Sequence, residues 1–316
     1  MPPDPTDEVV RVADVTLREH GQNVTRADLH RFDVDLRIAT AKRLVQAGVR
    51  RLEVLSCVSP RIAPAMDASL AGPVAQGIGR PPGTRLVTLV PNRQGLETFL
   101  RLGLGADGLG HTGGVFFSAV EAHNRANLGR SVAESLEEIR AVAREAQQRE
   151  IPLVGYVSAG FGFRPAPEKP VIPVDESDLR AYAAELFDLG AQTVTVSDLQ
   201  GVAGPTQTAS TLAALLEALP AEQRARLGYH PHHADRAAGL DLVEVAYDAG
   251  VRLFDASLGA AGGCVTGAPG NVPTEGVLER LEARGARTDI DLDAVKEAGA
   301  EFSAALLGSV GSGDGA

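Results

Sequence analysis

Three stretches of the chain share one pattern: VQAGVRRLEV at residues 45–54, FDLGAQTVTV at 187–196 and YDAGVRLFDA at 247–256. Each reads as the end of a helix, a glycine that stops it, and a following β-branched strand. On either side of these stretches, short β-branched runs alternate with longer segments of helical period. Such alternation is typical of βα units arranged around a parallel sheet.

Counting the units decides the architecture. The expected strands are residues 9–15, 51–55, 85–90, 109–117, 151–157, 193–197, 227–232 and 252–257, and the amphipathic segments between them include 35–47, 94–102, 131–149, 176–189, 206–219 and 240–249. Eight units with no linker favour closure into a (β/α)8 TIM barrel. A doubly wound open sheet is the alternative, but no GxGxxG follows the first strand.

Length and composition agree with one folded domain. The chain has 316 residues, of which 44% are hydrophobic and 22% charged, so it can bury a sizeable core. We expect a catalytic barrel over residues 9–307, preceded by a disordered extension at 1–8 and followed by a flexible tail at 308–316.

The charge and the cysteines exclude several classes of protein. A formal net charge of -11 argues against nucleic acid or an anionic membrane as the main partner. Cys57 and Cys264 stand in separate segments, which argues against a disulfide framework or a zinc knuckle. The first residues resemble no signal peptide, and no run of eighteen apolar residues occurs. We expect a cytoplasmic protein whose partner is a small molecule.

Polar residues follow several of the expected strands, and in a closed barrel these strand ends converge on one face. The sharpest signal is His230-Pro231-His232, because side chains two residues apart on a strand point to the same face, roughly 7 Å apart. Two such histidines also occur as plain core residues. With a carboxylate from another strand end, and Asp14, Asp198 and Asn271 as further oxygen donors, the set suits Mn²⁺, Mg²⁺, Co²⁺ or Zn²⁺.

Three motifs together resemble a known family: DVTLREHGQ at 14–22, HPH at 230–232, and GGC with a later GN between 262 and 271. The chain resembles the DRE-TIM metallolyases, most closely the 3-hydroxy-3-methylglutaryl-CoA lyases, from about residue 12 to 281. The resemblance implies that Glu19, His230, His232 and Asn271 hold a divalent metal, with Mg²⁺ or Mn²⁺ expected first and Co²⁺ or Zn²⁺ as alternatives.

The same resemblance implies roles for neighbouring residues. Arg18 would lie over the reacting carbonyl and stabilise an enolate oxygen; the alternative is an ion pair with Glu53 or another acid at the barrel mouth. Glu53 would hold Arg18 or bind the substrate, and Gln22 would lie near the metal or serve only in a loop hydrogen bond. Cys264 would donate a proton from a loop that closes over the substrate; the alternative is a small buried thiol.

The proton acceptor has several candidates. Asp14, Asp198, His111 and His233 are the possible bases, and we name Asp198 as the catalytic one. Asp14 alternatively caps a turn. His111 and His123 are better explained as loop histidines with satisfied hydrogen bonds than as ligands.

A CoA thioester would need cations for its phosphates. Arg61, Arg93 and Arg125 lie in loops expected at the barrel mouth, and Arg61 is the one we assign to the cofactor. Solvation of a surface side chain explains any one of them equally well.

The expected reaction is cleavage of a 3-hydroxy-3-alkylglutaryl-CoA-like substrate to acetyl-CoA and a 3-oxo acid. The lyases carry aspartate where this chain has Glu19, and a glutamate there is similar to homocitrate synthase, so Claisen condensation of acetyl-CoA with a 2-oxo acid is the main alternative. A 4-hydroxy-2-oxo acid aldolase and a non-catalytic ligand-binding barrel are further readings. The relatives suggest a homodimer.

Overall fold

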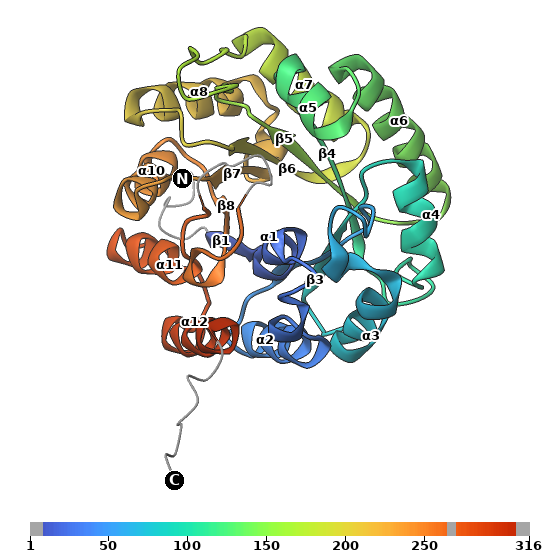
Figure 1. Ribbon diagram of the computed structural model, residues 1–316. Coiled ribbons are helices and arrows are strands. Elements are labelled where there is room, and N and C mark those ends of the chain that lie inside the picture. Colours follow the sequence, from blue (N-terminus) through green and yellow to red (C-terminus); the bar gives the residue numbers. More distant parts are fainter. Residues whose placement is uncertain (1–8, 264–269, 308–316) are drawn as a thin grey trace.

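A computed structural model describes residues 9–263 and 270–307 of the chain. Eight parallel strands form a closed barrel in the order of the sequence, and β8 returns to pair with β1 (Figure 1). The strands are β1 (Arg11–Asp14), β2 (Arg51–Ser56), β3 (Arg85–Leu89), β4 (Thr112–Ser118), β5 (Leu153–Ser158), β6 (Ala191–Asp198), β7 (Leu227–Pro231) and β8 (Leu253–Ala256). The predicted (β/α)8 TIM barrel is confirmed.

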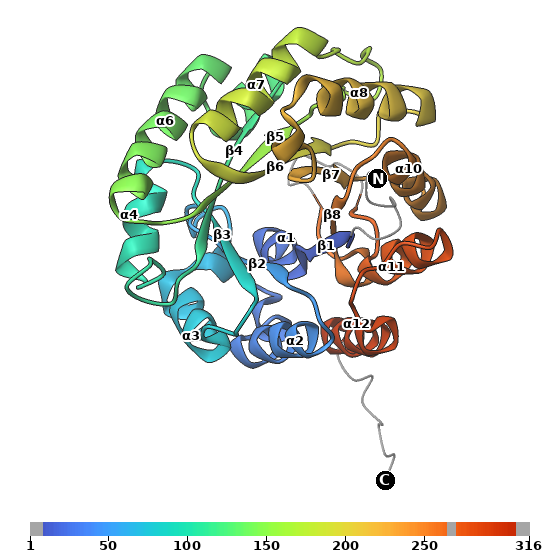
Figure 2. The same ribbon diagram turned by 180° about the vertical axis from the view of Figure 1, so that it is seen from behind.

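The helices form an outer ring, and α1 lies inside that ring, over the barrel (Figures 1 and 2). They are α1 (Thr16–Asn23), α2 (Val34–Gln46), α3 (Ala68–Ile78), α4 (Arg93–Arg101), α5 (Glu121–Leu128), α6 (Val132–Gln148), α7 (Glu176–Asp188), α8 (Pro205–Ala218), α9 (Ala221–Arg224), α10 (Arg236–Asp248), α11 (Thr274–Ala283) and α12 (Leu292–Leu307). In the described part of the chain no helix is long and apolar enough to cross a bilayer.

The three sequence stretches that predicted the fold behave alike in the structure. Gly48, Gly190 and Gly250 each adopt positive φ, at +98°, +91° and +105°, between the end of a helix and the next strand. This conformation disfavours residues with a Cβ, so glycine at these positions ends α2, α7 and α10 and lets the chain turn into β2, β6 and β8.

The structure differs from the expected elements at two places that matter for the site. The residues after β1, expected to be a loop, form helix α1, because Asp14 Oδ1 accepts a hydrogen bond of 3.0 Å from the Thr16 amide. The Thr16 hydroxyl in turn accepts one of 2.7 Å from the Leu258 amide, which ties the helix to the end of β8. Strand β4 begins at Thr112 rather than at 109, because the His111 amide bonds back to Leu104.

Candidate functional site

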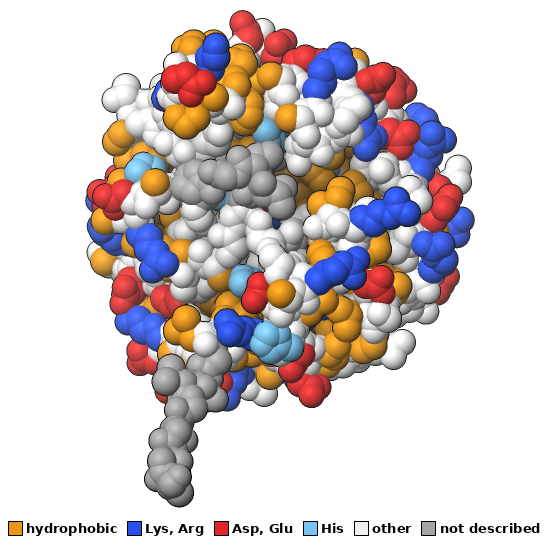
Figure 3. Space-filling model, viewed as in Figure 1, with side chains coloured by type: hydrophobic (Ala, Val, Ile, Leu, Met, Phe, Trp, Pro, Cys, Tyr) orange, Lys and Arg blue, Asp and Glu red, His pale blue; other side chains and the backbone are white. Residues whose placement is uncertain are grey.

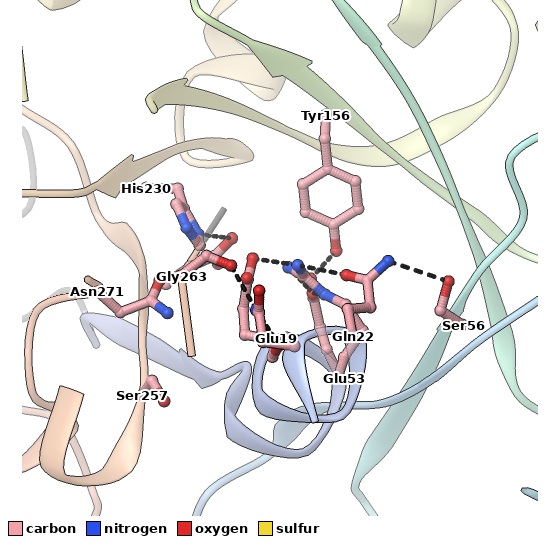
Figure 4. Close-up of polar contacts among 12 residues, drawn as sticks. Glu19, Gln22, Glu53, Ser56, Tyr156, His230, Ser257, Gly263 and Asn271 are labelled. Carbon is pink, nitrogen blue, oxygen red and sulfur yellow. Dashed lines mark hydrogen bonds and ion pairs between the residues drawn. The ribbon is translucent and has the colours of Figure 1, made fainter. Parts of the chain in front are cut away.

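Three buried side chains converge at the carboxyl ends of the strands. Glu19 on α1 and His230 and His232 at the end of β7 offer one potential ligand atom each, and these atoms lie within 4.8 Å of one another (Figure 4). The Nε2 atoms of the two histidines face each other at 2.8 Å. At most one of them can carry a proton at that distance, so at least one lone pair points into the space between them.

Two further residues support this cluster. The Asp255 carboxylate lies 3.3 Å from His230 Nδ1, which favours the proton on Nδ1 and leaves Nε2 free to bind an ion. Asn271 forms an isolated β-bridge with His232, and its Nδ2 donates to the Ala261 carbonyl at 3.0 Å. The buried Oδ1 of Asn271 has no hydrogen-bond partner among the described residues.

The donor set fits a divalent cation. It combines a carboxylate, two imidazole nitrogens and an amide oxygen, which is a mixed set of N and O ligands without thiolate. A cation would also explain the unpaired Asn271 oxygen, because buried polar atoms are rarely left without a partner. Asp255 was not foreseen from the sequence. The only signal was an acidic residue within the apolar strand LFDA at 253–256.

Arg18 is held between two carboxylates. Its Nε and Nη2 donate to Glu53 Oε2 at 2.7 and 2.5 Å, and its Nη1 contacts the Glu19 carboxylate. The Tyr156 hydroxyl donates to the other oxygen of Glu53. Burial alone would favour neutral Arg18, but the charges of Glu19 and Glu53 outweigh it and raise the pKa of the guanidinium. Arg18 therefore stays cationic, with its plane fixed beside the cluster.

The same charges act on Glu19. Burial would raise the pKa of its carboxyl, but Arg18 and the two histidines outweigh burial and lower it. Gln22 lies one helical turn beyond Arg18. Its Oε1 accepts a hydrogen bond of 3.4 Å from Arg18 Nη1, and its Nε2 donates one of 3.4 Å to the Ser56 hydroxyl. Glu19 is therefore ionised, with Gln22 close to it.

A cavity of about 560 Å³ opens above the cluster and is lined by Arg18, Glu19, Gln22, His230 and His232 among others. Figure 3 shows this face, on which many of the Lys, Arg, Asp and Glu side chains lie toward the periphery. Apolar residues such as Ile62 and Leu199 also line the cavity, so it combines a charged floor with apolar surface.

The loop after β8 reaches this cavity. Gly263 lines it, and the Gly263 carbonyl accepts a hydrogen bond of 2.5 Å from Asn23 on α1. Gly262 has a φ of +81° and passes so close to α1 that a Cβ there would lie 2.7 Å from the Cβ of Glu19. The approach requires glycine. Cys264 lies outside the described residues.

Asp14 and Asp198, which the sequence suggested as bases and oxygen donors, do not line this cavity. Asp14 accepts from the Thr16 amide and from the Thr274 hydroxyl, at 3.0 and 2.7 Å, and burial raises its pKa to about 6. Both carboxylate oxygens of Asp198 accept from backbone amides at residues 202 and 203, at 3.0 and 2.9 Å. These contacts make both residues anchors of loops: Asp14 caps a turn, and Asp198 fixes the segment after β6.

The other candidate histidines differ in whether they line the cavity. His111 precedes β4 and bonds the Thr88 hydroxyl at 2.9 Å, and His233 bonds the backbone of Asp235 at 2.7 Å; neither lines the cavity. His123 does line it. In the described structure neither ring nitrogen of His123 has a hydrogen-bond partner, so the expectation that its hydrogen bonds are satisfied is wrong. Burial lowers its pKa to about 4, which keeps the imidazole neutral.

The arginines proposed for CoA are placed differently from the expectation. Arg61 is exposed and is not among the residues that line the cavity, and Arg93 and Arg125 form ion pairs on the surface. Arg101 and Arg130 line it instead. Their positions were not foreseen, because only the fold shows which surface arginines turn toward the barrel mouth.

Comparisons with known proteins agree with this geometry. A family model described as HMGL-like matches residues 9–301. Hydroxymethylglutaryl-CoA lyase of Pseudomonas mevalonii is 33% identical, over 95% of this chain and 93% of that protein. The 3-hydroxy-3-isohexenylglutaryl-CoA/hydroxy-methylglutaryl-CoA lyase of Pseudomonas aeruginosa is 32% identical, over 96% and 95%.

A solved structure is also similar. The HMG-CoA lyase of Acinetobacter baumannii, in complex with coenzyme A and 3-methylmalate, superposes with a TM-score of 0.82 at 28% identity, covering 97% of this chain and 93% of that one. The family model and the relatives thus span nearly the whole barrel, including the residues that bring Glu19, His230 and His232 together. The chain belongs to the HMGL-like family of DRE-TIM metallolyases.

Proposed function

We propose that this chain is a divalent-metal-dependent carbon-carbon lyase that cleaves 3-hydroxy-3-methylglutaryl-CoA, or a 3-hydroxy-3-alkyl analogue, to acetyl-CoA and a 3-oxo acid. The lyase class follows from the family, and the substrate follows from the relatives' names. The observation that carries the proposal is the convergence of Glu19, His230 and His232 on one point beside Arg18.

These three residues, with Asn271, would hold the ion. Mg²⁺ or Mn²⁺ is the first expectation for this mixture of oxygen and nitrogen donors, and Co²⁺ or Zn²⁺ the alternative. When bound, the ion supplies a Lewis acid that orients the substrate oxygens and lowers the pKa of the 3-hydroxyl. Asp255 would set the tautomer of His230 for this purpose.

Arg18 would stabilise the charge that develops during cleavage. As the 3-hydroxyl gives its proton to a water molecule in the cavity, a C=O bond forms at C3, the C2–C3 bond breaks, and its electron pair moves onto the thioester oxygen as an enolate. A guanidinium fixed by Glu53 and Tyr156 needs no reorganisation to face that oxygen. Gln22 and Glu53 would position Arg18 rather than react.

The enolate must then gain a proton at C2 to become acetyl-CoA. We assign this proton to the Cys264 thiol, whose restoration by solvent completes the turnover. The support is that Gly263, the residue before it, lines the cavity and is bound to α1 through Asn23.

CoA would enter past Arg101 and Arg130, which line the mouth and offer cations for its phosphates. We further propose that the protein is a cytoplasmic homodimer. Sedimentation of the purified protein would measure the mass of the assembly.

The test is a product assay by mass spectrometry. Protein loaded with Mg²⁺ or Mn²⁺ should convert 3-hydroxy-3-methylglutaryl-CoA into acetoacetate and acetyl-CoA, and His232→Ala should not. Cys264→Ser should keep the metal but lose most of the turnover, and full turnover in that variant would reject the thiol as proton donor.

One observation favours a second function. Glu19 stands where the lyases carry aspartate, and a glutamate at this position is similar to homocitrate synthase. Incubation with acetyl-CoA and a panel of 2-oxo acids therefore belongs in the same assay. A condensation product without any cleavage would replace the lyase by a synthase on the same metal site.

A further inference from the structure

A second and larger cavity lies at the opposite end of the barrel. It measures about 930 Å³ and is lined by the beginnings of β1, β2, β3 and β4 together with residues 288–290. Figure 2 views the barrel from this side. It shares no lining residue with the cavity above Glu19. It is therefore a cavity distinct from that of the proposed reaction.

Arginine dominates the charge of this cavity. Five arginines line it: Arg11, Arg50, Arg51, Arg80 and Arg85. The one acidic residue among its described lining, Asp289, lies 3.3 Å from Arg287, outside that lining. The chain as a whole carries a formal charge of -11, so this basic cavity contrasts with an acidic molecule.

Most of these charges are not neutralised. Within residues 9–263 and 270–307, the side chains of Arg11, Arg80 and Arg85 have neither a hydrogen bond nor an ion pair. Arg50 donates to the Val45 carbonyl at 3.0 Å, which leaves its charge unpaired. Arg85 is half-buried, and burial together with the like charges of Arg51 and Arg11 lowers its pKa. An anion between these side chains would relieve that repulsion.

The cavity also has fixed, unsatisfied polar groups. Arg51 is 7% exposed and is held by Thr193 at 2.9 Å and by the Tyr156 hydroxyl at 2.8 Å, yet its Nε has no partner. The buried Thr84 hydroxyl also lacks one. The Arg80 guanidinium lies against the backbone at Gly110, where an added Cβ would be 2.8 Å from its Cζ. These donors are positioned before any ligand arrives.

We infer that this cavity is a binding site for a phosphate-bearing small molecule. The planar guanidinium matches two phosphate oxygens at once, and several guanidinium groups around one anion are typical of phosphate sites. A volume near 930 Å³ lies at the upper end of the range of small-molecule sites, so it admits an organic phosphate as well as the inorganic ion.

Inorganic phosphate is the probe, titrated into the full-length protein at constant ionic strength with binding measured by calorimetry and Tm by scanning fluorimetry. The Tm should rise with the logarithm of phosphate concentration above Kd. Arg80→Met and Arg85→Met should each weaken binding about tenfold, because each removes a charge-assisted contact. Arg144→Met is the matched control, since Arg144 is an exposed arginine of α6 outside the cavity.

Three results would overturn the inference. A wild-type protein that does not respond to phosphate would show that the arginines are merely solvated. Equal weakening in Arg144→Met would show a general ion effect, and loss of binding in His232→Ala with full binding in Arg85→Met would move the phosphate to the other end of the barrel.

Discussion

Glu53→Gln tests whether a buried carboxylate holds Arg18 in place. Glu53 is 1% exposed and is the partner of two guanidinium nitrogens of Arg18, at 2.7 and 2.5 Å. Removing one partner of a buried ion pair costs about 3–5 kcal/mol, because the other charge stays buried. Glu19 remains beside Arg18 and the glutamine oxygen still accepts one hydrogen bond, so we expect a value near 3 kcal/mol.

The assay is urea unfolding followed by circular dichroism, with turnover measured on the same samples. Glu138→Gln is the matched control, because Glu138 pairs with Arg93 at 3.1 Å in a pair that is 25% and 65% exposed. An exposed pair contributes about 0–1 kcal/mol. Turnover should fall in Glu53→Gln and stay unchanged in Glu138→Gln. Equal losses of stability in the two variants would refute the reasoning.

Further predictions concern the loop after β8, the buried Asp14 carboxyl, and the Asp255 carboxylate beside His230. Gly262→Ala should lower turnover, because its Cβ would strike α1 at Glu19. Gly285→Ala has a similar φ of +79° and open space, so it should affect stability alone, and equal turnover in the two variants would contradict the close approach. Burial raises the folded-state pKa of Asp14 from 3.8 to about 6, so its stabilising contribution, about 3 kcal/mol, is present below pH 4 and is lost as pH rises through 6. Asp14→Asn should remove this contribution from the pH dependence of urea unfolding, and an unchanged pH profile would refute it. Asp255→Asn should weaken metal affinity about 10–100-fold in a chelator competition, because it removes the partner of His230 Nδ1, and wild-type affinity would reject that role.

Much of the fold could be predicted from local patterns. Glycine stops and strand-forming runs are properties of neighbouring residues, so the stretches around Gly48, Gly190 and Gly250 predicted three junctions that the structure confirms. Helix α1 escaped prediction because contacts from distant residues stabilise it: the Thr16 hydroxyl accepts from the Leu258 amide, more than two hundred residues away. Such contacts have no signature in a short window of sequence.

The site divides in the same way. The strand period was enough to place His230 and His232 on one face, and the motif resemblance added Glu19. The sequence could not predict that both carboxylate oxygens of Asp198 accept hydrogen bonds from backbone amides. Nor could it predict that His123 lines the cavity with neither ring nitrogen paired in the described structure. Each of these outcomes depends on the path of a loop, which the local sequence does not determine.

The metal content of wild-type protein, compared with that of variants at Glu19, His230 and His232, tests the central claim most directly. Purified protein reconstituted with Mn²⁺ and passed over a desalting column should retain one ion per chain by elemental analysis. Glu19→Gln, His230→Ala and His232→Ala should each lose it, whereas His233→Ala, whose side chain bonds the backbone of Asp235 outside the cavity, should retain it. Retention of a full equivalent by His232→Ala, or wild-type turnover by protein stripped of metal, would contradict the account.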